Sequence, residues 1–233
     1  MTDQRIPEAL RRYAGRAILS DDLTADDVLI HQKGEMRFEA DGKWMPFTAE
    51  QRFSARRVGF QWHAWVKMAP LVTAVVDDAY GDGHGVLDAK VWGVVPVAHA
   101  EGVEVDRGEA ERYLAELPWN PMAILHNPEL QFSDGEDGAI RVWAGTPETY
   151  VDLQFDDAGD VASAFTRTRC RNTTPVPWGG RFTDYRAFGP VRIPSRGEVY
   201  WAPPEGEFVY WSGEVTGWET VAVALERGCV DMD

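Results

Sequence analysis

The chain has 233 residues and a formal net charge of −15. This length supports a large hydrophobic core without disulfide or metal staples, and the acidity disfavours binding to nucleic acid and to anionic lipid headgroups. Two cysteines, Cys170 and Cys229, are too few for a disulfide framework, so we expect free thiols. Residues 1–20 lack the apolar run of a signal peptide, and no segment holds the ~20 apolar residues that span a bilayer. We therefore expect a cytoplasmic protein without a transmembrane segment.

The first predicted element is a helix within residues 1–20. Pro7 suits a first helical position. Apolar residues also recur at helical spacing on one face, namely Leu10, Tyr13, Ala14, Ala17 and Ile18. An acidic connection over residues 21–27 follows this helix, and after it the apolar residues recur with a period of two.

Alternation with a period of two marks a first run of strands over residues 28–95. Strands over 28–40 and 43–55 flank Asp41-Gly42, which is a two-residue hairpin signal. In the next strand Phe60, Trp62 and Ala64 alternate with Gln61, His63 and Trp65, which predicts one buried and one wetter face. Strands over 71–80 and 86–92 are joined by a glycine-rich turn over 81–85. Because these connections are short, we expect antiparallel neighbours.

A helical insertion over residues 106–126 interrupts the strands. Asp106 is a suitable N-cap and Glu109 stands three residues later, as in a capping box. Arg112 and Glu116 lie one turn apart on a separate face and suit an exposed ion pair. Pro118 ends the main helix. The stripe expected to pack on the sheet consists of Ala110, Tyr113, Leu114 and Leu117.

A second run of strands covers residues 130–218, with strands over 139–144, 149–155, 161–171, 181–187, 191–201 and 208–216. Residues 173–180 hold two prolines and two glycines and are expected to form a loop. Residues 221–225 fit either a strand or a helix. No linker divides the chain, so we predict a single domain over residues 1–233. The predicted fold class is mainly β (α+β), a curved antiparallel sheet with an N-terminal helix and a central covering helix.

Several local motifs extend over nearly the whole chain. They are Gly34-Glu35-Met36-Arg37, Trp44-Met45-Pro46-Phe47, Gly59-Phe60-x-Trp62-x-Ala64, Asp78-x-Tyr80, Arg112-Tyr113-Leu114-Ala115-Glu116-Leu117-x-Trp119-x-Pro121, Trp178-Gly179-Gly180-Arg181-Phe182-x-Asp184-Tyr185 and Pro194-x-Arg196-Gly197-Glu198. In combination they resemble a bacterial family known only as a domain of unknown function. The resemblance implies a half-barrel similar to the lipoprotein-carrier (LolA-like) architecture, with helices against the concave side of the sheet, and it implies no activity. Some relatives carry an N-terminal membrane segment, and this sequence shows none.

Charged residues of the helix and the strands form a candidate site if the helix covers a concave sheet. The candidates for acid–base catalysis are Asp78, Tyr80 and Glu116. A structural ion-pair network that fixes the helix to the sheet explains the same residues, since no nucleophile has an adjacent base. The candidate ligand-binding residues are Trp62, Tyr80, Arg112, Glu116, Trp119, Arg181, Asp184, Arg196 and Glu198.

The sequence contains no recognisable metal or cofactor motif. Its five histidines lack the spacing of paired metal ligands, and the turn over 81–85 lacks the spacing of a phosphate-binding loop. We therefore expect no metal and no cofactor, and we place His84 at a solvated hairpin tip.

Ten tryptophans point to an aromatic-rich core, with two or three of them lining a pocket for an apolar ligand. The function we expect is binding of a small apolar or lipid-like molecule between sheet and helix, with Arg112 or Arg181 meeting an acidic headgroup. Two alternatives stay open: an enzyme that acts on a hydrophobic metabolite in the same cavity, and a structural or protein-interaction domain. Nothing in the sequence indicates an oligomeric state.

Overall fold

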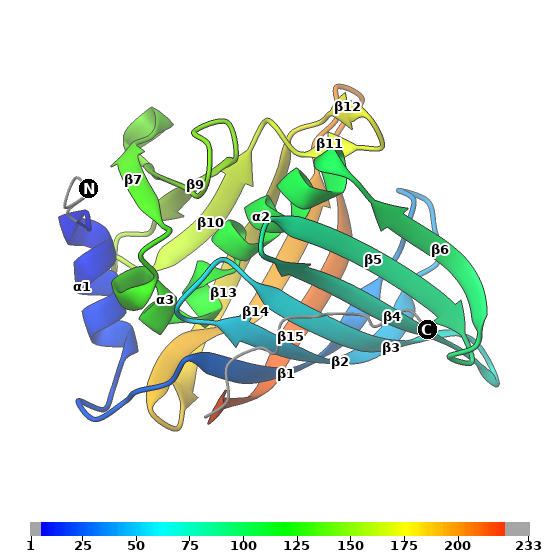
Figure 1. Ribbon diagram of the computed structural model, residues 1–233, viewed down its shortest axis with the longest axis horizontal. Helices are drawn as coiled ribbons and strands as arrows, with labels where there is room; N and C mark the ends of the chain where they lie inside the picture. The colour runs from blue at the N-terminus through cyan, green and yellow to red at the C-terminus, as the bar shows by residue number, and fades with distance from the viewer. Residues whose placement is uncertain (1–5, 222–233) are drawn as a thin grey trace.

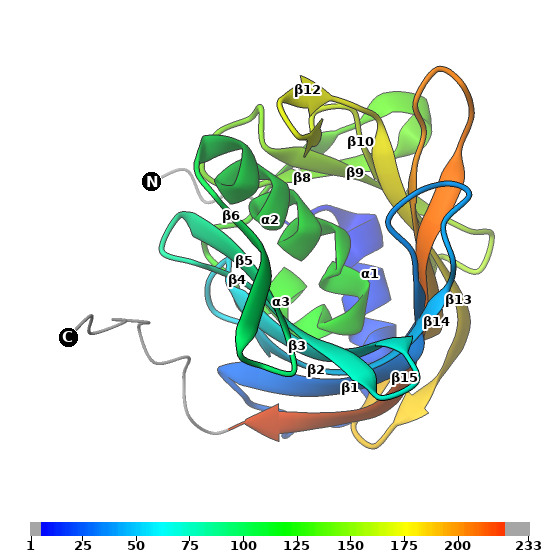
Figure 2. The ribbon, with the colours of Figure 1, turned by 90° about the vertical axis from the view of Figure 1, so that its right-hand side faces the viewer.

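The computed structural model describes residues 6–221, which form a thirteen-stranded antiparallel sheet curved around three helices (Figures 1 and 2). The first half contains α1 (Glu8–Ala17), β1 (Asp27–Met36), β2 (Met45–Ser54), β3 (Phe60–Ala69), β4 (Val72–Gly81), β5 (His84–Val91), β6 (Val95–Glu101), α2 (Val103–Ala115), the 3-10 turn η1 (Leu117–Trp119) and α3 (Pro121–His126). The second half contains β7 (Gln131–Asp134), η2 (Glu136–Gly138), β8 (Ile140–Trp143), β9 (Tyr150–Phe155), β10 (Val161–Thr166), β11 (Cys170–Arg171), β12 (Thr174–Pro175), β13 (Trp178–Phe188), β14 (Val191–Trp201) and β15 (Phe208–Val221).

The sheet joins its two halves through its first and last strands. The strand order is β6-β5-β4-β3-β2-β1-β15-β14-β13-β10-β9-β8-β7, so β1 pairs with β15 and the edges are β6 and β7. Helix α2 contacts β4, β5 and β6 on one side and β8, β9 and β10 on the other. The helix therefore bridges the opening between the two ends of the curved sheet (Figure 2).

Alternation along the strands decides which face is buried. In β2, Phe47 and Ala49 are buried between exposed neighbours, and in β3 the buried residues are Phe60, Trp62, Ala64 and Val66. These side chains belong to the same core as the buried residues of the helices, and the helices lie on the concave side of the sheet (Figure 2). Shifts of register interrupt five strand pairs, and such bulges bend and twist a sheet. The predicted mainly β fold, with an N-terminal helix and a central covering helix, is confirmed.

Both predicted apolar helix faces are buried. In α1, Leu10, Tyr13, Ala14 and Ala17 are buried, and the helix contacts α3 and β14. In the central helical segment the stripe from Ala110 to Leu117 is likewise buried against the sheet. Amphipathic spacing therefore identified the apolar face of each helix that packs in the core.

The capping box predicted at the start of the central helix is wrong. Helix α2 begins three residues earlier, at Val103, after Gly102 with φ 108° and without a side-chain cap. The Asp106 carboxylate instead accepts a hydrogen bond from the Gly85 backbone N–H at 2.7 Å, and Glu109 pairs with Arg169. Both residues thus connect the helix to its surroundings rather than closing its own first turn.

Four strand predictions also need correction. The sequence interpretation missed the edge strand β6, and it assigned to a loop the residues Trp178-Gly179-Gly180, which begin β13. The first hairpin has a wider loop than the Asp41-Gly42 signal suggested, since β1 ends at Met36 and β2 begins at Met45. Strand β15 continues to Val221 because β1 pairs with it from Trp211 to Val221, while residues 222–225 lie outside the described part.

Candidate functional site

A cavity of about 610 Å³ lies between the concave face of the sheet and helix α2. Its walls are mainly apolar and aromatic side chains from β1, β3 to β6 and β13 to β15. Its polar residues come from the strands, α2 and the segment between β10 and β11. The apolar wall includes Met36, Trp62, Val66, Met68, Val76, Leu87, Trp119, Trp178, Phe182, Trp201 and Trp211.

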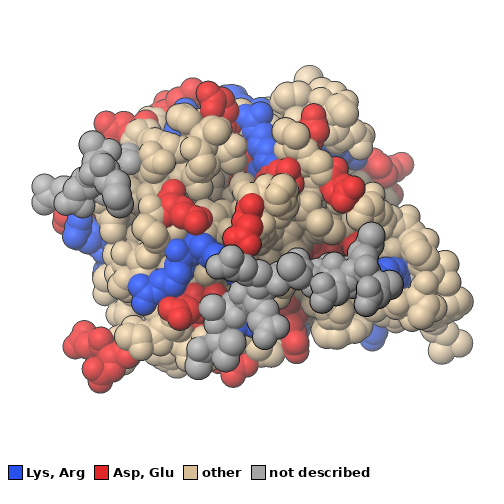
Figure 3. Space-filling model, viewed as in Figure 1, with Lys and Arg blue, Asp and Glu red and all other residues tan. Residues whose placement is uncertain are grey.

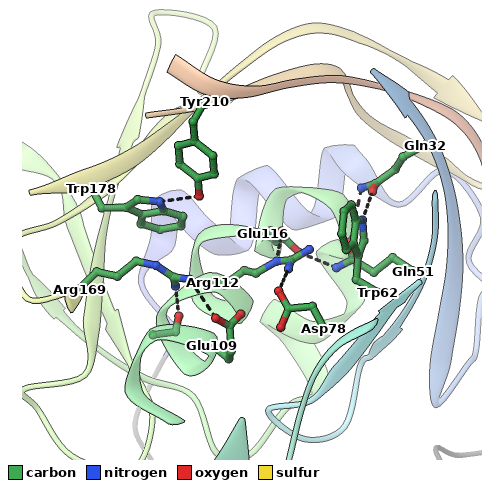
Figure 4. Close-up of polar contacts among 11 residues, drawn as sticks. Gln32, Gln51, Trp62, Asp78, Glu109, Arg112, Glu116, Arg169, Trp178 and Tyr210 are labelled. Atoms are coloured by element: carbon green, nitrogen blue, oxygen red, sulfur yellow. Dashed lines mark hydrogen bonds and ion pairs between the residues drawn. The ribbon is translucent and has the colours of Figure 1, made fainter. Parts of the chain in front are cut away.

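Arg112 is the centre of the polar part of this cavity. Its Nη1 donates to Asp78 Oδ2 on β4, and its Nε donates to Glu116 Oε1 one turn further along α2, at 2.9 Å. The guanidinium also lies 4.7 Å from the ring centroid of Phe60 and 5.1 Å from that of Trp62. The side chain of Arg112 is 15% exposed and that of Asp78 is 7% exposed. Glu116 is 12% exposed, so the pair expected on an exposed face is mostly buried. Two carboxylates and two aromatic rings hold Arg112, and Figure 4 shows its contacts with Asp78 and Glu116.

Two glutamines extend this network into the sheet. Gln51 Nε2 donates to Glu116 Oε2, Gln32 Nε2 donates to Gln51 Oε1 at 3.4 Å, and Trp62 Nε1 donates to Gln32 Oε1 at 2.8 Å (Figure 4). Both glutamines are buried. Buried amides need partners on both sides, so this chain fixes the orientation of Glu116 and of the Trp62 ring.

A second guanidinium, that of Arg169, lies beside the first. Its Nη2 donates to Glu109 Oε1 at 3.0 Å and its Nη1 to the Gly108 carbonyl, so it anchors the segment after β10 to α2. The guanidinium lies 4.6 Å from the Trp178 ring centroid, and Trp178 Nε1 donates to the Tyr210 hydroxyl at 3.0 Å. Figure 4 shows the two arginines side by side over the helix.

Burial shifts the acid–base properties of this cluster. Desolvation, followed by the nearby negative charge of Glu109, raises the pKa of Asp78 to about 8, although Arg112 opposes the shift. On the far side of α2, desolvation raises the pKa of Glu111 to about 7, despite its hydrogen bond from Thr168. The Arg112 pKa rises because Glu116 and Asp78 outweigh its desolvation. Both arginines stay charged, while Asp78 holds a proton more tightly than an ordinary carboxyl.

Three glycines in a row across the sheet allow the aromatic side chains of the cavity wall to pack closely against the backbone. Gly34, Gly213 and Gly197 are cross-strand neighbours on β1, β15 and β14. A Cβ on Gly213 would stand 2.3 Å from the Trp211 ring, and one on Gly197 would stand 2.9 Å from the Trp119 ring. The two indoles therefore lie directly on the backbone of the sheet, which leaves the space above them to the cavity.

The structure brings together only part of the predicted site. Trp62, Asp78, Arg112, Glu116 and Trp119 all line the cavity. Tyr80 points from the same face of β4 but is absent from the residues that line the cavity, and burial raises its pKa.

The predicted strand charges of β13 and β14 do not converge on the cavity. Arg181 and Glu198 are register partners, and with Asp184 and Arg196 they line a separate hollow on the outer face. Arg181 pairs with Glu207 at 2.6 Å and Arg196 pairs with Asp184 at 3.0 Å. Alternation explains the error for Arg181, Arg196 and Glu198, because Phe182 and Gly197 occupy the inward positions beside them. Asp184 is two residues from Phe182, but its φ of 55° interrupts the alternation. The backbone of β14 brings Glu198 to the edge of the cavity lining as well, but its side chain is exposed.

Sequence reasoning missed Gln32, Gln51, Glu109, Arg169 and Tyr210. The glutamines carried a signal, since both fall on the buried phase of their strands, where a polar residue requires a partner. Arg169 carried no such signal in the sequence, because it reaches α2 from a short segment about 60 residues further along the chain.

Other classes of site find no support in the described residues. Over residues 6–221, no three His, Cys, Asp or Glu side chains are grouped so as to hold a metal ion. Within the same residues, no helix has both the length and the hydropathy needed to cross a membrane. His84 lies at the start of β5 with its side chain largely in solvent. Cys170 is a free thiol, and Cys229 lies outside the described range.

Fold and site together define a curved antiparallel sheet with an apolar cavity closed by a helix. The model of a family of unknown function, DUF6920, matches residues 4–219, so the chain belongs to this family. The predicted resemblance to a family of unknown function is thereby confirmed. No curated protein matches the sequence.

Two solved structures are similar to this chain over most of its length. The chain is similar to a LolA superfamily protein from Nitrosomonas europaea, with 9% identity, coverage of 92% of this chain and 93% of that chain, and a TM-score of 0.47. It is also similar to a DUF1329 family protein from Desulfovibrio piger, with 10% identity, coverage of 94% and 92%, and a TM-score of 0.43.

We expect the protein to lose stability as the pH rises from 5 to 8. Asp78 and Glu111 have raised pKa values in the folded state, so the folded protein binds more protons than the unfolded chain in this range. The stability they contribute is present at low pH and is lost as the pH rises through the folded pKa values. The substitution Asp78→Asn should flatten the decline by up to roughly 1 kcal/mol per pH unit in urea unfolding. The exposed control Asp184→Asn should leave the slope unchanged, and an equal slope in both variants would contradict the assignment.

Proposed function

We propose that this protein binds a small apolar molecule, such as a lipid, in the cavity under α2. The observation that carries the proposal is the cavity itself, with about 610 Å³ of space, walls of Trp, Met, Val and Phe, and one buried polar cluster. Ligand sites have this volume and this division between apolar walls and a few fixed polar groups. An ion-pair network that served only to attach the helix would require no such space beside it.

The entrance to the cavity supports the proposal. Phe38, Met68 and Val97 line the cavity and are also exposed at the surface, so the cavity opens where they lie. The neighbouring hairpin tips add Leu71, which is 96% exposed, and Trp92, whose Nε1 donates to the Leu71 carbonyl. On the face shown in Figure 3, this end of the molecule, built by β3 to β6, has few charges. An apolar molecule would therefore meet apolar side chains on its way in.

The experiment is to look for a ligand and then to fill its space. Native mass spectrometry of protein purified from its source should show an additional mass that organic extraction removes. Ala89 lies on β5 with its side chain on the cavity wall, so Ala89→Trp should reduce occupancy at least several-fold. The matched control is Ala79→Trp on the outer face of β4, opposite Gln61, and it should retain the mass. Equal loss in both variants, or an unliganded wild-type protein that also fails to take up added alkyl probes, would refute the proposal.

One observation favours the enzymatic alternative. Burial holds the Asp78 pKa at about 8, so this carboxyl would be mostly protonated at neutral pH and suited to donate a proton to a ligand in the cavity. Of the other two residues in the predicted acid–base set, Glu116 lines the cavity and Tyr80 does not. A ligand recovered with an altered mass after incubation with wild-type protein, and unaltered after incubation with Asp78→Asn, would establish this function. Unaltered recovery from both proteins would leave binding alone.

A further inference from the structure

Two carboxylate oxygens beside the cavity have no hydrogen-bond partner within the part of the chain that the structure describes. They are Asp78 Oδ1 and Glu109 Oε2, both with negligible accessible surface, and both residues line the cavity. The other oxygen of each carboxylate is bound, Asp78 Oδ2 by Arg112 and Glu109 Oε1 by Arg169. Each side chain is thus fixed in place while one acceptor stays unmatched (Figure 4). Such an unmatched buried acceptor costs free energy that a donor on a ligand would recover.

The arginines that line the cavity are already paired with groups of the protein. Arg112 contacts two carboxylates and two aromatic rings, and Arg169 contacts Glu109, the Gly108 carbonyl and the Trp178 ring. Arg37 also lines the cavity, and it donates to the Val209 and Ala40 carbonyls and covers the Trp44 ring.

The cluster therefore contains more acid than base. Three carboxylates, of Asp78, Glu109 and Glu116, face the two guanidiniums of Arg112 and Arg169. An acidic headgroup would add a negative charge at a place where both guanidiniums are already paired with carboxylates of the protein. In the free protein Asp78, whose pKa is raised, offsets this excess by holding a proton, and a positively charged donor would displace that proton and supply the missing hydrogen bonds.

We propose that the ligand carries an amine or another cationic hydrogen-bond donor as its headgroup, seated on Asp78 Oδ1 and Glu109 Oε2, with its apolar part along the aromatic wall. This inference rests on the proposed binding function and gives it a ligand class. It reverses the acidic headgroup expected from the sequence, because Arg112 is saturated and Arg181 lies on the outer face.

The test compares three probes with the same alkyl chain: dodecylamine, 1-dodecanol and dodecanoate. Isothermal titration calorimetry at pH 7.5, below micelle formation, should give the order amine, alcohol, acid, with at least a ten-fold preference for the amine over the acid. Glu109→Gln and Asp78→Asn should each reduce the preference for the amine over the alcohol at least three-fold. If Asp78→Asn does not fold, Glu109→Gln alone tests the headgroup inference.

The control addresses the general attraction of an amine to an acidic protein. Glu50 is an exposed residue on the outer face of β2, next to Gln51, and Glu50→Gln removes one charge without touching the cavity. This variant should keep the wild-type preference. Equal loss of the preference in Glu50→Gln and Glu109→Gln, or dodecanoate binding as tight as dodecylamine binding, would overturn the headgroup inference. In that case, binding of 1-dodecanol would still support the proposed function. Failure of all three probes to bind would overturn both.

Discussion

Replacing Arg112 by alanine should lower the free energy of unfolding by about 3–5 kcal/mol. The substitution removes one guanidinium from two buried carboxylates, those of Asp78 and Glu116, and from the faces of Phe60 and Trp62. Removing one partner of a buried ion pair is costly because the remaining charge loses its compensation without regaining water. Here the loss is larger than for an isolated pair, since Glu109 also lies near the carboxylates that remain.

Urea unfolding of Arg112→Ala and Arg196→Ala measures this effect against a matched control. Arg196 also pairs with one carboxylate, that of Asp184, but the two side chains are 65% and 63% exposed. Exposed pairs contribute little, so Arg196→Ala should cost less than about 1 kcal/mol. Arg112→Met, which keeps some packing on the rings without the charge, should fall between the two. If Arg112→Ala were as mild as Arg196→Ala, the cluster would not stabilise the helix on the sheet.

The sequence predicted most elements of the fold because most of them carry a periodic apolar pattern. The edge strand β6 was missed because the residues of Val95–Glu101 are mostly exposed and include Pro96, which is tolerated at sheet edges but argues against a strand interior. The start of α2 was misplaced because Asp106 and Glu109 match a local capping rule while tertiary contacts use both side chains elsewhere. Local rules fail where a side chain has a stronger distant partner.

The candidate site was predictable only on the helix. Arg112, Glu116 and Trp119 share α2 and the turn after it, so their proximity follows from helical spacing. The strand partners depend on register, which fixes Asp78 opposite Trp62 on the inward face and Arg181 opposite Glu198 on the outward face. A shift of one residue in a strand exchanges these faces, so residue type alone was insufficient to decide between them.

Replacing Gly34 by alanine should be the most damaging small change at the seam between β1 and β15. A Cβ at this position would stand 2.2 Å from the Ser212 carbonyl oxygen and 2.7 Å from the Gly213 Cα, both of which are backbone atoms. A side chain can turn away from a clash, but a paired backbone cannot. The two strands must separate, with loss of hydrogen bonds that join the two halves of the sheet. We expect a loss of about 3 kcal/mol or more in the free energy of unfolding, at the upper end of overpacking effects.

Two other glycines make this prediction specific to the seam. Gly81, at the end of β4, and Gly15, in the last turn of α1, have no atom within 4 Å of an added Cβ. Gly81→Ala should be neutral, and Gly15→Ala should stabilise the protein by roughly 0.5–1 kcal/mol because alanine favours the helix.

Because the seam also carries Gly213 under the Trp211 ring, Gly34→Ala should both change the tryptophan fluorescence of the folded state and weaken ligand uptake. A fully stable Gly34→Ala protein with wild-type fluorescence would mean that β1 and β15 are not paired in this register.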